Sequence, residues 1–194
     1  MKKFAIVTAI LVTLAGCSAS TVAEAKTVET VSTAVISKTE QGLWKPSASI
    51  HPMTLIAKQA IARQNLIDNT ARVKTVTKKL HKYVNKTWYV FAGSTPRGWD
   101  CSGLVKWYYK QLGKDLPHNA TAQKFMGKPH RFSVAKAKVG DIIWFPGHDG
   151  IYVGNGYMIH SPHPGVRTQR YKVWQWAKDN GTNNVTYTRL IKTK

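Results

Sequence analysis

The sequence predicts an α+β domain in which helices precede an antiparallel sheet. Two amphipathic segments, 71–86 and 102–112, repeat apolar residues at the three- and four-residue spacing of helices. After residue 138 the pattern changes to short β-branched and aromatic runs separated by glycine-containing turns. Helices that precede the strands, rather than alternating with them, favour an antiparallel sheet packed against helices.

The first 25 residues have the organisation of an export signal. Two lysines precede an apolar stretch, residues 4–14, that is too short to span a bilayer. Leu14-Ala15-Gly16-Cys17 is similar to a bacterial lipobox, in which Cys17 would become the lipidated N-terminus. Cleavage after the small-x-small run ending at Ala25 is the alternative and would release the protein. We therefore expect an exported protein, either anchored to a membrane by lipid or secreted.

Residues 26–70 are expected to form a linker or tether, because Ser, Thr, Ala and Val dominate up to residue 50. A helix is expected within this segment at 53–68. The folded domain is expected to span 71–194, and lysines occupy the polar face of its first helix. The apolar face of that helix consists of Val73, Val76, Leu80 and Val84.

The remaining elements are bounded by turn residues. A turn-rich loop at 94–98 precedes the second helix, which ends at Gly113, a typical C-cap residue. Asn155-Gly156 is the sequence of a two-residue hairpin turn. Strands are expected at 142–145, 150–154, 157–160 and 185–191.

The chain is strongly basic, with 29 Lys and Arg against 9 Asp and Glu and a net charge of +20. A basic surface suits an anionic partner, or it serves solubility alone. Export argues against nucleic acid as that partner. All three glutamates precede residue 41, so the sequence gives little support to a glycosidase with two catalytic carboxylates.

Cys101 is the only cysteine outside the export segment, so an internal disulfide of the domain is excluded. It lies directly before the second helix, in Gly98-Trp99-Asp100-Cys101-Ser102-Gly103. The partial positive charge of a helix N-terminus is expected to lower the pKa of the thiol. This placement predicts a cysteine nucleophile.

A cysteine nucleophile requires a histidine that takes its proton and a third group that orients this histidine. His148 and His160 lie on either side of the Asn155-Gly156 turn, so hairpin pairing would bring them close. Either histidine could instead bond a loop carbonyl. A zinc site of Cys101, His148, His160 and His163 is a further alternative, but the spacing matches no compact zinc pattern.

Seven segments occur in the order of a known family. They are Trp88–Gly93, Asp100–Val105, Leu116–His118, Gln123, Gly140–Phe145, His148–Gly154 and Ile159–His160. Together they resemble the NlpC-type, papain-like cell-wall cysteine endopeptidases. The resemblance implies an α+β papain-like fold with the nucleophile at a helix start, packed on an antiparallel sheet.

The resemblance also implies the roles of individual residues. Cys101 would be the nucleophile, His148 the general base and His160 the group that orients His148. Members typically cut peptidoglycan stem peptides at the γ-D-glutamyl bond to a diamino acid, and no cofactor or metal is implied. The partners would be peptidoglycan and anionic wall polymers, met either as a cell-envelope lipoprotein or as a protein secreted to the wall. Contact with the substrate is implied for Tyr89, Asp100 and Ser102.

Asp149 departs from the family pattern, in which an apolar residue usually follows the histidine. Strand alternation predicts that Asp149 faces solvent, and the alternative is that it repels a charge or forms a salt bridge near the site. Two other functions stay open: an amidase or acyltransferase that uses the same Cys–His pair on another wall amide, and a non-catalytic wall-binding module. Nothing in the sequence indicates an oligomeric state.

Overall fold

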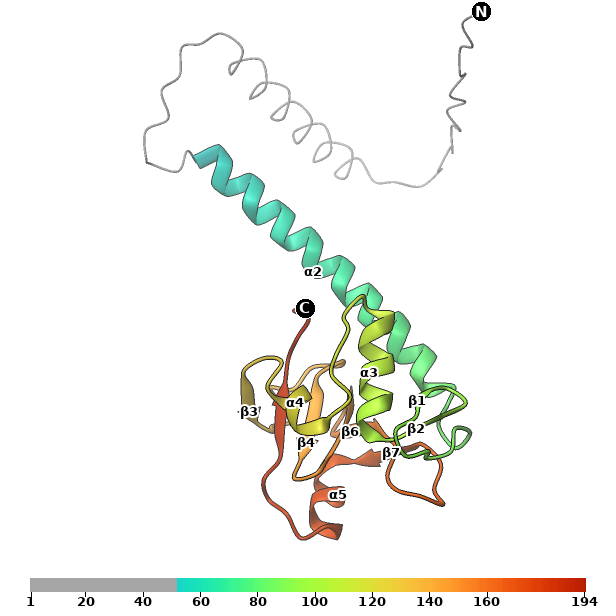
Figure 1. The fold of residues 1–194 in the computed structure, drawn as a ribbon. Helices are drawn as coiled ribbons and strands as arrows, with labels where there is room; N and C mark the ends of the chain where they lie inside the picture. The colour runs from blue at the N-terminus through green and yellow to red at the C-terminus, as the bar shows by residue number, and fades with distance from the viewer. Residues whose placement is uncertain (1–51) are drawn as a thin grey trace, which may run out of the picture. The chain divides into compact units, whose positions relative to one another are not determined.

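The computed structural model describes residues 52–194 (Figure 1). The expected export signal with Cys17, and the part of the expected linker before residue 52, lie outside the described residues. None of the described helices is long and apolar enough to cross a membrane. In chain order the elements are α2 (Pro52–His81), β1 (Ser94–Thr95), β2 (Gly98–Trp99), α3 (Cys101–Gln111), α4 (Ala120–Lys124), β3 (Pro129–Arg131), β4 (Ile142–Phe145), β5 (His148–Gly154), β6 (Tyr157–His160), β7 (Gln169–Lys172), α5 (Val173–Asp179) and β8 (Thr186–Thr188).

Six of the strands form one antiparallel sheet in the order β3-β8-β4-β5-β6-β7. β4, β5 and β6 are neighbours in both sequence and space. The turn between β5 and β6 is Asn155-Gly156, and both residues have positive φ, 54° and 78°. This is the conformation that a two-residue hairpin requires. The predicted α+β fold, with helices packed on an antiparallel sheet, is confirmed.

Both faces of the sheet are covered, and this decides where the strand residues point. On one face, Ile142, Ile151 and Ile159 pack with α3 and the last turns of α2. On the other face, Ile143 and Met158 pack with α5. Successive side chains along β4, β5 and β6 therefore point alternately into the two buried layers, rather than alternately into the core and into solvent.

α2 is one continuous helix of 30 residues, where the sequence suggested separate helices at 53–68 and 71–86. The residues between those ranges include no Pro or Gly, so nothing interrupts the helix. Its first turns extend away from the sheet (Figure 1) and expose Leu55 and Ile56. Its C-terminal part enters the core through Val73, Val76 and Leu80.

The sequence pattern did not indicate α4, β3, β7 or α5. Each has seven residues or fewer, which is too short to show a clear period. β8 is shorter than the strand expected at 185–191, because its pairing with β4 ends where Thr188 lies opposite Ile142, the first residue of β4. Of these elements α5 matters most for function, because it covers the histidine pair.

Candidate active site

Asp100 fixes the start of α3. Its carboxylate accepts the Gly103 backbone N–H at 2.7 Å and the Ser102 hydroxyl at 3.1 Å, as a helix N-cap does. It also accepts the Ala92 backbone N–H at 2.9 Å and lies 2.8 Å from His118 Nε2. These contacts tie the first turn of α3 to two loops. Because Asp100 and Ser102 are engaged inside the protein, their contact with a substrate stays a prediction.

Gly103 allows a loop to approach this helix start closely. A Cβ at this position would lie 1.9 Å from the Gly93 carbonyl oxygen. The same carbonyl accepts the Asp100 backbone N–H at 3.1 Å. Only glycine leaves enough room for this packing, which gives a physical reason for glycine two residues after the cysteine.

Cys101 is partly exposed at the first position of α3, and its surroundings disfavour the thiolate. Burial raises the pKa of the thiol to about 12, and the charges of Asp149 and Asp100 act in the same direction. The backbone N–H groups of Asp149 and Ser102 lower this pKa but do not offset the rise. The structure thus differs from the lowered pKa expected of a helix N-terminus, because desolvation and two carboxylates outweigh it.

Tyr89 lies beside the thiol. Its backbone N–H donates to the Val166 carbonyl at 3.0 Å, and it forms a bridge with Trp99, two residues before the cysteine. Burial, followed by the negative charges of Cys101 and Asp100, raises the pKa of its phenol. The hydroxyl therefore stays neutral and can donate a hydrogen bond near the sulfur.

His148 and His160 form the pair that the hairpin predicts. His148 begins β5, His160 ends β6, and His148 Nε2 lies 2.8 Å from His160 Nδ1. Gly150 provides room for this pair, because a Cβ there would lie 2.9 Å from the Cβ of His160. The predicted proximity of the two rings is confirmed. The contact leaves His148 Nδ1 free to take a proton.

Trp176 of α5 covers both imidazoles, a position that no sequence pattern indicated. Its ring centroid lies 4.9 Å from that of His148 and 4.4 Å from that of His160. Burial lowers the pKa of His148 to about 4, and His163 acts in the same direction. Burial, followed by His148 and His163, holds the pKa of His160 well below its usual value. Both rings are therefore neutral at neutral pH, as a general base must be.

Asp149 is fully buried, so the prediction that it faces solvent is wrong. Alternation does direct it away from the face of His148, but the face it reaches is covered by α3. Among residues 52–194, no N–H or O–H group donates to either oxygen of its carboxyl. Burial, followed by the charge of Asp100, raises the pKa of this carboxyl well above its usual value.

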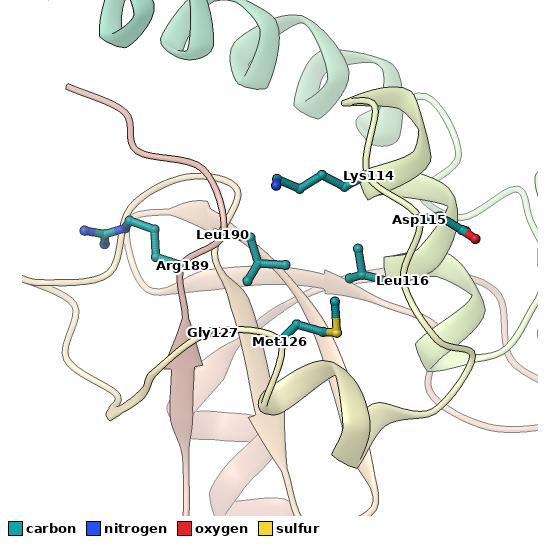
Figure 2. A pocket seen from close by; sticks show the side chains of 7 residues that line it. All are labelled: Lys114, Asp115, Leu116, Met126, Gly127, Arg189 and Leu190. Atoms are coloured by element: carbon teal, nitrogen blue, oxygen red, sulfur yellow. The ribbon is translucent and has the colours of Figure 1, made fainter. Parts of the chain in front are cut away.

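Two surface cavities of ≈ 350 Å³ differ in their relation to these residues. One cavity lies between the segment that follows α3, the residues after α4 and the residues after β8, where Leu116, Met126 and Leu190 point toward one another (Figure 2). Neither Cys101 nor the histidine pair lines it, so that cavity is not part of the site. The other cavity reaches the histidine pair and is lined by Phe145, Pro146, Gly147, His148, Pro162, His163, Trp176, Asn180 and Thr182.

The zinc alternative finds no ligand set in the described part of the chain. No group of three or more His, Cys, Asp or Glu side chains within residues 52–194 is placed to hold a metal ion. His163, the fourth ligand of that alternative, has its Nδ1 3.0 Å from the carbonyl oxygen of Pro164.

Residues 86–182 match the family model described as the NlpC/P60 family. The chain is 38% identical over 112 residues to the bifunctional muramidase/DL-endopeptidase CwlT of Bacillus subtilis, covering 53% of this chain and 33% of that protein. It is 35% identical over 102 residues to the probable endopeptidase p60 of Listeria monocytogenes, covering 50% and 20%. The chain thus spans a third or less of the length of these relatives.

Solved structures show the same fold. The NlpC/p60 domain of the peptidoglycan hydrolase SagA matches 60% of this chain and 98% of that domain, at 29% identity and a TM-score of 0.51. A hypothetical invasion protein of Mycobacterium tuberculosis matches 66% of this chain and 65% of that chain, at 22% identity and a TM-score of 0.55. The second likeness concerns the fold alone.

Proposed function

Because this chain belongs to the NlpC/P60 family, we propose that it is a cysteine endopeptidase that hydrolyses peptidoglycan stem peptides. The observation that carries the proposal is the 2.8 Å contact between His148 Nε2 and His160 Nδ1, on a sheet packed against the helix that starts at Cys101. Its α+β fold is the papain-like fold of that family. The relatives named as endopeptidases support the reaction class.

Cys101 and His148 are both neutral before the reaction. In the acylation step the thiol proton therefore moves to His148 as the new C–S bond forms. The Cys101 sulfur attacks the scissile carbonyl carbon while His148 Nδ1 takes the thiol proton. His160 Nδ1 holds the imidazolium by its hydrogen bond to His148 Nε2. Backbone N–H groups at the start of α3 stabilise the negative oxygen. When the C–N bond breaks, His148 returns the proton to the leaving amine and a thioester remains on Cys101.

In the second step water hydrolyses the thioester. His148 takes a proton from the water as its oxygen attacks the thioester carbonyl carbon. The C–S bond breaks, and the proton returns to the Cys101 sulfur with release of the carboxylic acid product. The cavity that reaches His148 offers a route for the peptide and for water.

The bond we propose is the one between γ-D-glutamate and a diamino acid. Its support is the resemblance of the motifs, together with the DL-endopeptidase activity named for the Bacillus subtilis relative. The net charge of +20 suits peptidoglycan and anionic wall polymers. Export, with a lipid anchor at Cys17 or with release into the wall, would bring the enzyme to this substrate.

Digestion of purified peptidoglycan tests the proposal. Wild type should produce muropeptides whose stems end in D-glutamate, and Cys101→Ala should produce none, as read by mass spectrometry. Asp115→Asn, at an exposed carboxylate far from the site, should behave as wild type. Release of intact stems would indicate an amidase instead. Equal products from wild type and Cys101→Ala would overturn the cysteine mechanism, and binding to the wall with no products would indicate a binding module.

A further inference from the structure

Three neighbouring strands place a row of polar side chains on the face of the sheet that α3 and α4 cover. Thr186 of β8 is paired with Trp144 of β4, and Trp144 is paired with Asp149 of β5. Residues paired across antiparallel strands share a face. α4 packs over the same strands, and its Lys124 carbonyl accepts the Thr188 hydroxyl at 2.7 Å. We call Thr186, Trp144 and Asp149 the buried polar row.

The buried polar row is unusual because its polar atoms have no nitrogen or oxygen partner among residues 52–194. Thr186 Oγ1, Trp144 Nε1 and both oxygens of Asp149 are buried without such a hydrogen bond, and only the Cys101 thiol bonds the Asp149 carboxyl. Buried polar groups are normally paired, so an unpaired set calls for a specific explanation. A carboxylate is the most costly member of such a set to bury.

Asp149 is also the member of the row that reaches the reacting atom. Its backbone N–H lies at the Cys101 sulfur, and the charge of its carboxyl raises the pKa of the thiol. The thiol in turn forms a hydrogen bond with the carboxyl, which lowers the pKa of Asp149 but does not offset the rise caused by burial. Cys101 is the hydrogen-bonding group that faces this carboxyl from α3. Neither His148 nor His160 shares its face of the sheet.

We propose that Asp149 is a positioning residue that sets the nucleophilicity of Cys101 through its own protonation. As a neutral acid, Asp149 donates an O–H hydrogen bond toward the sulfur and stabilises the thiolate that forms during attack. As a carboxylate, it repels that thiolate and slows the attack. The inference rests on the proposed role of Cys101 as the nucleophile.

The charged groups around Asp149 leave the carboxyl poorly compensated. From α3 it meets Cys101 and the carboxylate of Asp100, which are both negative when ionised. From α4, Lys124 places its Nζ 3.6 Å above the Trp144 ring and so contacts the indole of the row. From β4 and β8, Trp144 and Thr186 contribute no charge. The raised pKa of Asp149 agrees with this arrangement.

Alkylation of Cys101 by iodoacetamide tests the inference without any wall substrate. The rate constant at the Cys101 peptide, followed by mass spectrometry on the full chain, is measured from about pH 5 to pH 10 for wild type, Asp149→Asn and Asp149→Val. The Asn amide keeps a donor and cannot ionise, whereas the apolar side chain of Val has no donor. Asp115→Asn serves as the control for loss of one exposed carboxylate.

The expected pattern has two parts. At the acid end, Asp149→Asn should react at the wild-type rate and Asp149→Val more slowly, because only Val lacks the donor. At the alkaline end, both variants should react about tenfold or more faster than wild type, because only wild type carries the opposing charge. Asp115→Asn should follow wild type throughout.

Parallel profiles of wild type and both variants over the whole range would overturn the inference, provided that near-UV circular dichroism shows intact folds. The wild-type profile gives a check that needs no variant. It should stay nearly flat between the ionisation of Asp149 and that of the thiol, whereas a single unassisted thiol gives one smooth rise. Alkylation measures the reactivity of the thiol and does not depend on peptide cleavage. A failure of this inference can therefore be told apart from a failure of the proposed hydrolase function.

Discussion

The Trp176 indole packs edge to face with the His160 imidazole, with ring centroids 4.4 Å apart and ring planes inclined by 73°. His160 Nε2 is buried with no hydrogen-bond partner in the described part of the chain. A proton on this nitrogen can therefore interact only with the aromatic rings around it. Such a proton leaves His160 Nδ1 to accept from His148 Nε2, which puts a lone pair on His148 Nδ1. The indole thus favours the tautomer that a general base needs.

Replacing Trp176 should therefore change the chemistry as well as the packing. In Trp176→Ala we expect kcat to fall about tenfold or more, and the acid limb of the kcat/KM profile to move to higher pH. The shift is expected because water entering the site would return the pKa of His148 toward 6.5 from about 4. Trp174→Ala, at a more exposed position of the same helix, is the matched control. An unchanged acid limb in Trp176→Ala would contradict this role.

Removing the orienting group should slow the reaction more than it weakens binding. His160→Ala loses the 2.8 Å contact to His148, and we expect kcat to fall by about 10²- to 10⁴-fold with little change in KM. His160→Asn keeps an acceptor and should recover part of the loss. His81→Ala, an exposed histidine of α2, provides the control. A KM effect alone would assign His160 to substrate binding.

The pH dependence of the wild type follows from the neutral base. Since burial lowers the pKa of His148 to about 4, the free base is present above that pH and is lost by protonation below it. The acid limb of kcat/KM should therefore lie near pH 4 rather than near 6.5. Stopped assays on a soluble stem peptide between about pH 3 and pH 8 would show this. A limb near 6.5 would mean that water reaches His148 in the free enzyme.

The cap at Asp100 should matter for stability as well as for placing Cys101. Asp100→Ala removes the acceptor of two backbone N–H groups and one hydroxyl, and we expect a loss of about 2 kcal/mol or more in the free energy of unfolding. Asn119→Ala removes the exposed cap of α4 and should cost about 1 kcal/mol or less. Urea unfolding followed by circular dichroism measures both. Equal losses would show that the additional contacts of Asp100 contribute little.

The parts of the site that could be predicted from sequence depend on short-range geometry. Asn155-Gly156 fixes the pairing of β5 with β6, so the approach of His148 to His160 follows from a two-residue turn. The start of α3 follows from an aspartate followed by an apolar periodic segment. These features require no knowledge of what packs on the sheet.

The parts that could not be predicted depend on what covers each face. Alternation predicted correctly that Asp149 points away from the face of His148, but it could not show that α3 buries that side. The position of Trp176 depends on α5, a helix of seven residues without a readable period. The raised pKa of Cys101 is a sum of burial and two carboxylates that only the tertiary structure brings together.

Because α2 is continuous, it sets the distance between Pro52 and the core of the domain. A 30-residue helix is about 45 Å long, and roughly 30 Å of it precedes Val73, the first residue that enters the core. A flexible linker would let the domain sample a sphere whose radius grows with the square root of the linker's length. A helical segment acts instead as a stiff spacer. It keeps the domain core roughly 30 Å from Pro52, so inserting or deleting helical turns would change this distance by about 5 Å per turn.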